Sequence, residues 1–474
     1  MNCVERAFSH RQASPDKMAL WTVDGGALSF VQLFELAARA QKLFQRRGLR
    51  AGDHALVMLP PGPALFAATL ALAALGACAV LVEPWMPVAR IDHVLGSVRP
   101  RLFLAGLPGR LWGLRIPAVR RIPHWIGRRA LAGETSPGPF RVEETPAHHP
   151  ASIAFSSGTT GAPKGVVRTH GYLWDLHALL ARDEDPRRAA GPDLSVFANV
   201  ALFHLGTGRG AICVPPRWSP GNLRRAAAAA ATLGAESVSA GPAFLLQLLR
   251  TQGFDTLRSF YVGGALTDCW ILEDGFRRWP AAKWTHIYGG TEAEPVALSD
   301  AREAVAKSRA RGHFQTLFLG TPIPEVRADL TPDAAWVAGP NVCGEYLGAP
   351  DETRLHKRRD AAGVLWHDMG DRVVADADGW WFAGRSAQPH EDFAREQAIY
   401  AHLESSASFI QRDPTGRPWL AGEGVAARTA EIRTRHPGLD LAGTVELRIR
   451  RDRRHRARID RVASLKKGAP WLAG

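Results

Sequence analysis

A stretch of ten residues, Ser156 to Gly165, has the side-chain types needed to hold a polyphosphate. Its four hydroxyl side chains, three glycines and one lysine stand in the order Ser156-Ser157-Gly158-Thr159-Thr160-Gly161-Ala162-Pro163-Lys164-Gly165. Glycines let the backbone approach a ligand closely, hydroxyls and amides bond phosphate oxygens, and one ammonium group neutralises their charge. A Walker loop is excluded, because its lysine follows a glycine and precedes Ser or Thr, unlike Lys164. The stretch predicts a phosphate-binding loop of another kind, the alternative being a polar surface turn.

A second group of polar residues follows strand-like runs further along the chain. The run from Phe260 ends on Gly263-Gly264-Ala265, and Tyr288-Gly289-Gly290-Thr291-Glu292 comes some 25 residues later. In an open parallel sheet, ligands bind beyond the carboxyl ends of the strands, where glycines expose the backbone. A Gly-Gly turn by itself is weak evidence for a ligand site. Its interpretation therefore depends on the residues that follow it.

Several helical and strand-like patterns alternate in the chain and must position these residues. A helix is expected from the N-cap Ser29 to Arg46, followed by a strand over 54–58, a helix over 64–75 and a strand over 78–82. Similar pairs follow the phosphate loop, with helices expected over 169–181, after Ser219 and after Gly241. Alternating helices and strands favour parallel sheets with crossover helices. The segment 88–141 is poorly periodic and supports no functional prediction.

Length and composition describe a folded protein of more than one domain. The chain has 474 residues, of which 46% are apolar, and one hydrophobic core rarely serves so many residues. Its five cysteines are odd in number and scattered, which argues against a disulfide framework or a zinc site and favours a reducing compartment. A cytoplasmic location is therefore expected.

Two features of the chain are also found in membrane proteins and in nucleic-acid-binding proteins. The apolar run 64–82 approaches membrane-spanning length, but Gly76 divides it into a helix and a short strand, so no transmembrane segment is expected. The net charge of +13 raises the question of nucleic acid, and residues 448–461 hold eight arginines. These arginines could face a carrier protein, coenzyme A phosphates or nucleic acid, or form a solvated basic face. No recognisable nucleic-acid motif supports nucleic-acid binding.

The phosphate loop resembles the signature loop of the adenylate-forming superfamily, which includes acyl-CoA synthetases, luciferases and nonribosomal-peptide adenylation domains. Residues 157–165 match that pattern throughout, and 288–292 is similar to its Tyr-Gly-x-Thr-Glu motif. Residues 366–371 resemble its Tyr-x-Thr-Gly-Asp motif, with Met369 in place of threonine, and Gly384-Arg385 follows. The resemblance covers roughly residues 20–465 and is strongest over 150–386.

The resemblance implies a role for each matched residue. Tyr288 would stack on adenine, Thr291 would bond the α-phosphate and Glu292 would hold Mg²⁺. Asp371 and Arg385 would bind the ribose, although an aspartate here also suits a simple turn. The residues implied to bind ATP are Ser156, Ser157, Gly158, Thr159, Thr160, Gly161, Lys164, Gly263, Gly264, Ala265, Tyr288, Gly289, Thr291, Asp371 and Arg385.

Two further residues are expected to take part in catalysis. His204 lies in Phe203-His204-Leu205-Gly206, which loosely fits an aromatic-His-x-x-Gly stretch whose histidine lines the acyl site. Arg458 stands where the family carries a lysine that contacts the carboxylate and the α-phosphate. Arginine offers a planar fork in place of a compact ammonium, so it is not equivalent. The neighbouring Lys466 or Lys467 could take that place instead.

The implied fold is α/β: a large domain of parallel-sheet layers over 1–383, a hinge over 384–389 and a small mobile α+β lid over 390–474. The tail departs from the family, because 386–390 holds neither the usual hinge acid nor a lysine. Residues 453–460 resemble a stretch of olefin β-lactone synthetases and some fatty-acyl ligases.

The implied function is ATP-dependent activation of a carboxylic acid, fatty or hydroxy-fatty, to an acyl-adenylate with release of pyrophosphate. ATP and Mg²⁺ are the expected cofactors, and coenzyme A or a phosphopantetheinyl carrier protein the expected acceptor. One alternative is a β-lactone synthetase, in which the 3-hydroxyl of the acid attacks. Another is a degenerate nucleotide-binding protein without full catalysis.

Overall fold

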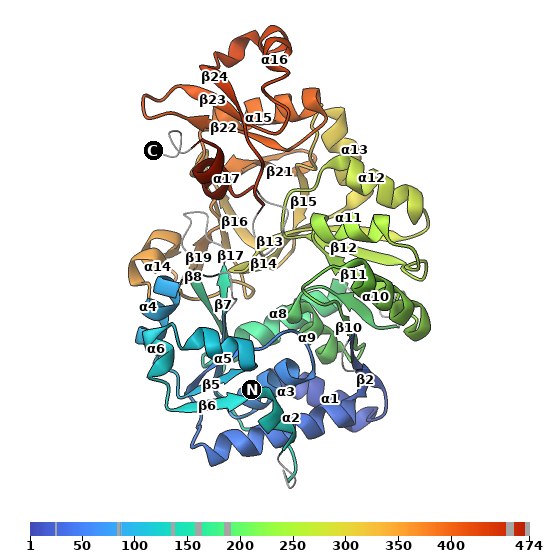
Figure 1. The fold of residues 1–474 in the computed structure, drawn as a ribbon, viewed down its shortest axis with the longest axis vertical. Helices are drawn as coiled ribbons and strands as arrows, with labels where there is room; N and C mark the ends of the chain where they lie inside the picture. The colour runs from blue at the N-terminus through green and yellow to red at the C-terminus, as the bar shows by residue number, and fades with distance from the viewer. Residues whose placement is uncertain are drawn as a thin grey trace.

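The computed structural model describes the chain except for residues 24–25, 83–85, 87, 134–137, 157–163, 184–190, 452–458 and 470–474. Its described strands form four sheets, two large and two small. The two large sheets and their helices make up the lower and middle parts of Figure 1, and the last strands and helices form a smaller unit at the top. The predicted α/β fold, a large domain followed by a small C-terminal one, is confirmed.

The first large sheet carries the phosphate loop. Its strands, in spatial order, are β6 (His124–Gly127), β5 (Leu102–Ala105), β3 (His54–Met58), β4 (Cys78–Leu81), β7 (Pro150–Ser156) and β8 (Lys164–Thr169). Its helices are α2 (Phe30–Arg46), α3 (Pro63–Ala74), α4 (Val88–Val98), α5 (Leu107–Gly113), α6 (Pro117–Arg120) and α7 (Arg128–Ala132). All neighbouring strands are parallel except β7 and β8, which pair antiparallel. The phosphate loop thus joins two paired strands, and Lys164 begins the second of them.

The second large sheet carries the other predicted motifs. Its strands are β2 (Gly26–Ser29), β1 (Met18–Thr22), β10 (Ala211–Cys213), β9 (Asp193–Ser195), β11 (Ser237–Ala240), β12 (Ser259–Gly263), β13 (Lys283–Gly290), β14 (Ala293–Asp300), β15 (Phe318–Pro322), β21 (Gly379–Arg385) and β20 (Asp371–Asp376). Further helices of the large domain are α1 (Glu5–Ala13), α8 (His170–Asp183), α9 (Ala198–Thr207), α10 (Pro220–Leu233), α11 (Pro242–Arg250), α12 (Cys269–Arg278) and α13 (Ala301–Ala310). The strands from β1 to β13 are parallel and the last four are antiparallel, so the sheet is mixed.

The remaining elements form two small sheets. A sheet beside the cleft contains β16 (Arg327–Leu330), β17 (Ala335–Ala338), β19 (Leu365–Asp368) and β18 (Lys357–Arg359), with helix α14 (Pro350–His356). The C-terminal unit contains β22 (Ser408–Arg412), β23 (Pro418–Gly422), β24 (Gly443–Glu446), α15 (His390–Leu403), α16 (Thr429–Arg435), the 3₁₀ turn η1 (Pro437–Leu439) and α17 (Arg461–Gly468). Strand β21 therefore ends within the segment predicted as the hinge, and α15 begins directly after that segment.

Local sequence explains where the first helices begin and end. The Ser29 side chain accepts a hydrogen bond from the Gln32 backbone while Gln32 bonds back, a capping box at the predicted start of α2. Gly76 has a φ of +67°, and a Cβ there would lie 3.2 Å from Ala51 and Thr145, so only glycine ends α3 without strain. The apolar run is thus split as predicted, and no helix of the described chain is long and apolar enough to span a membrane.

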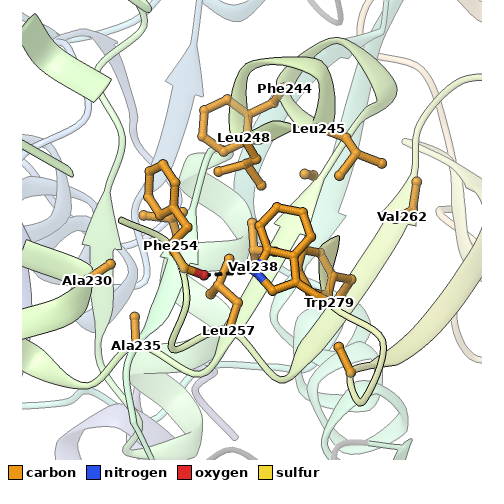
Figure 2. Close-up of a cluster of buried hydrophobic side chains, with 14 of the residues drawn as sticks. Ala230, Ala235, Val238, Phe244, Leu245, Leu248, Phe254, Leu257, Val262 and Trp279 are labelled. Atoms are coloured by element: carbon orange, nitrogen blue, oxygen red, sulfur yellow. Dashed lines mark hydrogen bonds between the residues drawn. The ribbon is translucent and has the colours of Figure 1, made fainter. Parts of the chain in front are cut away.

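A buried hydrophobic cluster fixes the second sheet under the site. Side chains of β11 and β12 pack against helices α10 to α12, and the indole of Trp279 donates a 3.1 Å hydrogen bond to the Phe254 carbonyl (Figure 2). Trp284 of β13 stacks on Phe260 of β12 with ring centroids 3.9 Å apart. Because these rings lie on adjacent strands, they hold the two strand ends that carry the glycine motifs in a fixed relation.

Candidate active site

A large cleft of about 3230 Å³ runs between the two large sheets and reaches the C-terminal unit. The predicted residues that line it are Lys164, Gly263, Gly264, Ala265, Tyr288, Gly289, Thr291, Glu292, Asp371 and Arg385. Residues 157–161 and Arg458 lie outside the described part of the chain, as does the side chain of Ser156. The structure thus brings together predicted residues from across more than 200 positions of sequence.

The glycine motifs sit where two parallel strands end. Gly263 of β12 lies in register with Ile287 of β13, and a Cβ on Gly263 would come within 2.8 Å of the Ile287 carbonyl. Gly264 follows with a φ of +84°, which glycine adopts without strain. The chain therefore turns away sharply at the strand end and leaves backbone exposed to the cleft, beside Tyr288.

Tyr288, Asp371 and Arg385 form one hydrogen-bonded group. The Tyr288 hydroxyl donates to Asp371 Oδ2 at 2.9 Å, and Arg385 Nη1 lies 2.6 Å from Asp371 Oδ1. Asp371 and Arg385 face each other across the β20 and β21 pair. Burial, together with the Asp371 carboxylate, raises the pKa of Tyr288 well above its usual value, so the phenol stays protonated as a donor. The arrangement fixes the Tyr288 ring and presents a charged, oriented carboxylate at the cleft wall.

A second group joins the end of the phosphate loop to the glutamate of the Thr291-Glu292 turn. Lys164 is buried, and its Nζ lies 2.7 Å from Glu352 Oε2 on α14. The same ammonium sits 5.3 Å from the centroid of the Tyr346 ring. The Tyr346 hydroxyl in turn donates to Glu292 Oε1 at 3.2 Å. Tyr346 therefore links the loop lysine to the carboxylate predicted to hold Mg²⁺.

Two buried cations support this group from behind. Arg168 of β8 donates to the Thr291 carbonyl at 3.2 Å and to Glu294 Oε1 at 3.0 Å, which fixes the turn between β13 and β14. Lys357 of β18 donates to the Cys343 carbonyl at 2.6 Å, and burial lowers its pKa to about 8. Sequence reasoning missed Arg168, Tyr346, Glu352 and Lys357. The sequence offers a signal for only one of these four residues, Tyr346, which directly follows the pair Gly344-Glu345.

The donor set fits a magnesium ion accompanied by a nucleotide. In the described chain no three His, Cys, Asp or Glu side chains gather to hold a metal by themselves. Mg²⁺ is typically held by one or two carboxylates together with substrate phosphates and waters. Glu292, which lines the cleft and is linked through Tyr346 to Lys164, is a suitable single carboxylate.

The predicted histidine lies away from the cleft. His204 is buried, with Nε2 3.4 Å from Asp193 Oδ2, and it is the neighbouring Phe203 that lines the cleft. Although burial opposes the charge, His204, Arg209 and Ser237 lower the pKa of Asp193 to about 2. This cluster ties β9 to α9 and β11. The structure thus places His204 inside the fold and not on the cleft wall. A direct contact between His204 and the acid stays a prediction, and the position of this side chain does not support it.

A different histidine lines the cleft. His177 of α8 packs on Phe203 with ring centroids 5.1 Å apart, and burial lowers its pKa to about 4. A Cβ on Gly206 would lie 2.4 Å from His177 Nε2, so the glycine of the Phe-His-x-Gly stretch makes room for this ring. Apolar side chains that also line the cleft include Leu173, Leu176, Leu180, Phe197, Trp218 and Phe244.

The C-terminal unit closes one side of the cleft. Arg451 and Ile459 form an antiparallel bridge, and both line the cleft, as does Lys466 of α17. The described residues on either side of the segment that contains Arg458 therefore both line the cleft. Ser406 donates to Asp268 at 2.9 Å, which ties the unit to the large domain.

The connecting segment is held without the usual hinge acid. Arg372 of β20 donates to the Gln388 carbonyl at 2.6 Å, and the Gln388 side chain donates to Glu396 of α15 at 3.0 Å. Arg461 lies 2.8 Å from the same glutamate. Arg372 of the large domain and Glu396 of the small unit thus fix the connecting segment, which has no acidic residue of its own.

Comparison with known proteins agrees with this geometry. A family model described as AMP-binding enzyme matches residues 8–347. The chain is 29% identical to the olefin β-lactone synthetase of Stenotrophomonas maltophilia over 385 residues, which cover 72% of this chain and 69% of that protein. It is 25% identical to a feruloyl-CoA synthase of Amycolatopsis sp over 396 residues, 75% of this chain and 73% of that protein.

A longer relative and two solved structures extend the comparison. A probable non-canonical nonribosomal peptide synthetase of Salinispora arenicola is 28% identical over 403 residues, but this chain spans only 5% of its length. The O-succinylbenzoate coenzyme A synthetase of Bacillus subtilis, solved with AMP, has a TM-score of 0.77 at 18% identity, covering 95% of this chain and 96% of that one. An amide bond synthetase of Marinactinospora thermotolerans gives 0.79 at 18% identity, covering 98% and 99%.

At these identities the solved structures show the shared fold, while the family model matches most of the chain. Together with the motifs that meet in one cleft, these matches place the protein in a family. The chain belongs to the AMP-binding enzyme family and is an acid-activating ligase of the AMP-forming type.

Proposed function

We propose that the protein joins ATP to a carboxylic acid with a long apolar part, giving an acyl-adenylate and pyrophosphate. A carboxylate oxygen forms a bond to the α-phosphorus, the bond from that phosphorus to the bridging oxygen breaks, and pyrophosphate leaves with the electron pair. Such an in-line displacement needs positioning and charge neutralisation more than acid-base chemistry. The observation that carries the proposal is that the Asp371 group and the Lys164 group both face one cleft with an apolar wall.

Each group has a distinct task in this reaction. Asp371 and Arg385 bind the ribose, and the hydrogen bond from Tyr288 keeps its ring in place against the adenine. Lys164 exchanges its ion pair with Glu352 for the phosphates of ATP and neutralises the departing pyrophosphate. A Mg²⁺ ion, which Glu292 would hold, supplies further neutralisation of the phosphate charge.

The acid is proposed to be fatty or hydroxy-fatty because of the apolar side chains that line the cleft. The leucines of α8 and the aromatic rings of α9 and α11 offer little that would pair with a polar acid. Burial favours an apolar substrate by about 25 cal/mol for each Å² of apolar surface removed from water. A screen of ATP–pyrophosphate exchange over fatty, 3-hydroxy-fatty, aryl and amino acids tests both parts of the proposal. Exchange with amino or small aryl acids but with no fatty acid would refute the assignment of the substrate class.

The acceptor of the acyl group distinguishes two functions. In the first, a thiol of coenzyme A or of a carrier protein attacks the acyl carbon, and AMP leaves. In the second, the 3-hydroxyl oxygen of the acid attacks its own acyl carbon, the bond to AMP breaks, and a proton is lost to solvent as a β-lactone forms. The similarity to olefin β-lactone synthetases and the absence of the usual hinge acid favour the second. Mass spectrometry of products from a 3-hydroxy acid, with and without coenzyme A, separates the two.

Arg458 is proposed to contact the reacting carboxylate, although it lies outside the described residues. Single-turnover formation of acyl-adenylate by Arg458→Ala, Arg458→Lys and a Lys466→Ala/Lys467→Ala double variant tests this role. A slow Arg458→Ala variant, rescued in part by lysine, supports it. A normal Arg458→Ala variant beside an inactive double variant assigns the role to the lysines. A protein that binds ATP but exchanges no pyrophosphate with any acid is the degenerate alternative.

A further inference from the structure

One segment of the large domain carries most of the net positive charge of the protein. Residues 93–133 contain eight arginines and no acidic residue, in a chain whose whole excess is +13. The pattern of apolar residues in this segment predicts no function. In the structure it forms the end of α4, strands β5 and β6 and helices α5, α6 and α7, at the β6 edge of the first sheet (Figure 1).

Helix α5 in this segment exposes a row of leucines. Leu107, Leu111 and Leu114 are 68%, 58% and 54% exposed. Their spacing of four and three residues places them on one face of the helix and of its C-cap. The described chain has nine exposed large apolar side chains in all, and three of them lie in this single row. Such clustering marks a surface that is covered in use.

Unpaired arginines lie beside this row. Ala105 of β5 pairs with Gly127 of β6 in parallel register, so Leu107 and Arg128 follow neighbouring strand ends. A Cβ on Gly127 would lie 3.6 Å from the Arg110 guanidinium, which places Arg110 next to Arg128. Arg110, Arg128 and Arg129 are exposed, and none makes a salt bridge within the part of the chain that the structure describes. The α5 patch consists of Leu107, Arg110, Leu111, Leu114, Arg128 and Arg129.

We propose that the α5 patch docks the protein on an anionic lipid surface. Leucines on one helix face can enter the boundary between headgroups and acyl chains, while neighbouring arginines bind lipid phosphates. A nucleic acid would use the arginines but leave the leucines exposed to water. A bilayer uses both and requires no surface of matching shape, and this complementarity of charge and apolar area favours it over an acidic protein partner.

The position of the patch relative to the cleft adds a consequence for substrate entry. Leu107, Arg110, Arg128 and Arg129 belong to the patch and also line the cleft that contains the active site. An acid with a long alkyl chain, held in the lipid surface with its carboxylate at the headgroups, can therefore enter without crossing bulk water. Docking itself does not depend on which acid the enzyme activates.

Co-sedimentation of the full chain with lipid vesicles tests the proposal. Vesicles of phosphatidylcholine with about 30% phosphatidylglycerol should pellet the protein at low salt, whereas pure phosphatidylcholine should pellet much less. Each basic residue near an anionic surface contributes about fivefold in partitioning, so Arg128→Gln/Arg129→Gln should weaken binding about 25-fold. Leu111→Ser/Leu114→Ser should weaken it about tenfold or more, even on anionic vesicles.

A matched pair of arginines elsewhere provides the control. Arg224 and Arg225 are exposed on α10, so Arg224→Gln/Arg225→Gln removes the same charge from a different surface and should leave vesicle binding unchanged. Thermal unfolding of each variant checks that the fold is retained. The proposal is overturned if the wild type does not sediment with anionic vesicles, or if the patch variants sediment as the control does. If the wild type bound no vesicles and the patch variants lost acyl transfer to an acidic carrier protein, the patch would be assigned to a protein partner instead.

Discussion

Tyr346→Phe isolates one hydrogen bond that the structure places at the centre of the site. The hydroxyl donates to Glu292 Oε1 at 3.2 Å, while the ring packs near Lys164 and Lys357 at 5.3 Å and 5.6 Å. Phenylalanine keeps the ring and removes only the donor. A hydrogen bond to a charged group contributes about 1.5–3 kcal/mol, and a bond of this length belongs near the lower value. We therefore expect a loss of about tenfold in the rate of ATP–pyrophosphate exchange.

The dependence on magnesium shows whether the loss arises at Glu292. Without the hydroxyl the carboxylate is less well oriented, so the Mg²⁺ concentration required for half-maximal exchange should rise. Tyr400→Phe is the matched control, because its hydroxyl donates to the Ser408 carbonyl within the C-terminal unit at 2.8 Å. That variant should lose some stability and keep the magnesium requirement of the wild type. Tyr346→Phe with normal exchange at all Mg²⁺ concentrations would refute the role given to this bond.

Three further predictions concern the ribose, the acid and the dependence of stability on pH. Asp371→Ala should raise the KM for ATP tenfold or more with an intact fold, and a change in melting temperature alone would indicate a turn-forming role. Gly206→Ala should raise the KM for the acid but not for ATP, because its Cβ would lie 2.4 Å from His177 Nε2; an equal rise in both would contradict this. Burial lowers the pKa of His286 to about 4, so the folded state binds fewer protons than the unfolded state below pH 6.5. The free energy of unfolding is therefore not reduced by His286 above pH 6.5, and it falls by up to about 3 kcal/mol as the pH drops from 6.5 to 4. Chemical denaturation of His286→Gln should show a shallower loss over that range, and an unchanged slope would show that the histidine does not titrate as inferred.

Local signals in the sequence were sufficient for most of the fold around the site. The cap at Ser29, the break at Gly76 and the glycine pair at Gly263 act over a few residues, so their patterns predict the elements that they end or begin. Segment 88–141 shows no clear periodicity over α5, α6 and α7, which are only 7, 4 and 5 residues long, although α4 in the same segment spans 11 residues. Helices of that length are too short to show a periodic apolar pattern.

The contacts within the site depend on distances that sequence spacing does not encode. Glu352 reaches Lys164 across 188 positions, and Arg168 reaches Glu294 across 126. Sequence spacing also could not show which histidine lines the cleft. His177 and His204 are both near aromatic residues, and only the packing of α8 against α9 decides which of the two rings lines the cleft. Motif residues with a fixed place at a strand end, such as Tyr288 and Thr291, line the cleft as their motif predicts, and their roles there stay predictions.

The central claim is that Lys164, Glu292 and Asp371 form one ATP-dependent site for activating an acid. Exchange of labelled pyrophosphate into ATP, measured with the best fatty or hydroxy-fatty acid for wild type and for Glu292→Gln, tests it most directly. We predict exchange that requires both the acid and Mg²⁺, and a fall of about a hundredfold or more in Glu292→Gln, since a charge that holds the metal is lost. Wild-type protein that binds ATP without acid-dependent exchange, or a Glu292→Gln variant with near-normal exchange, would contradict the account.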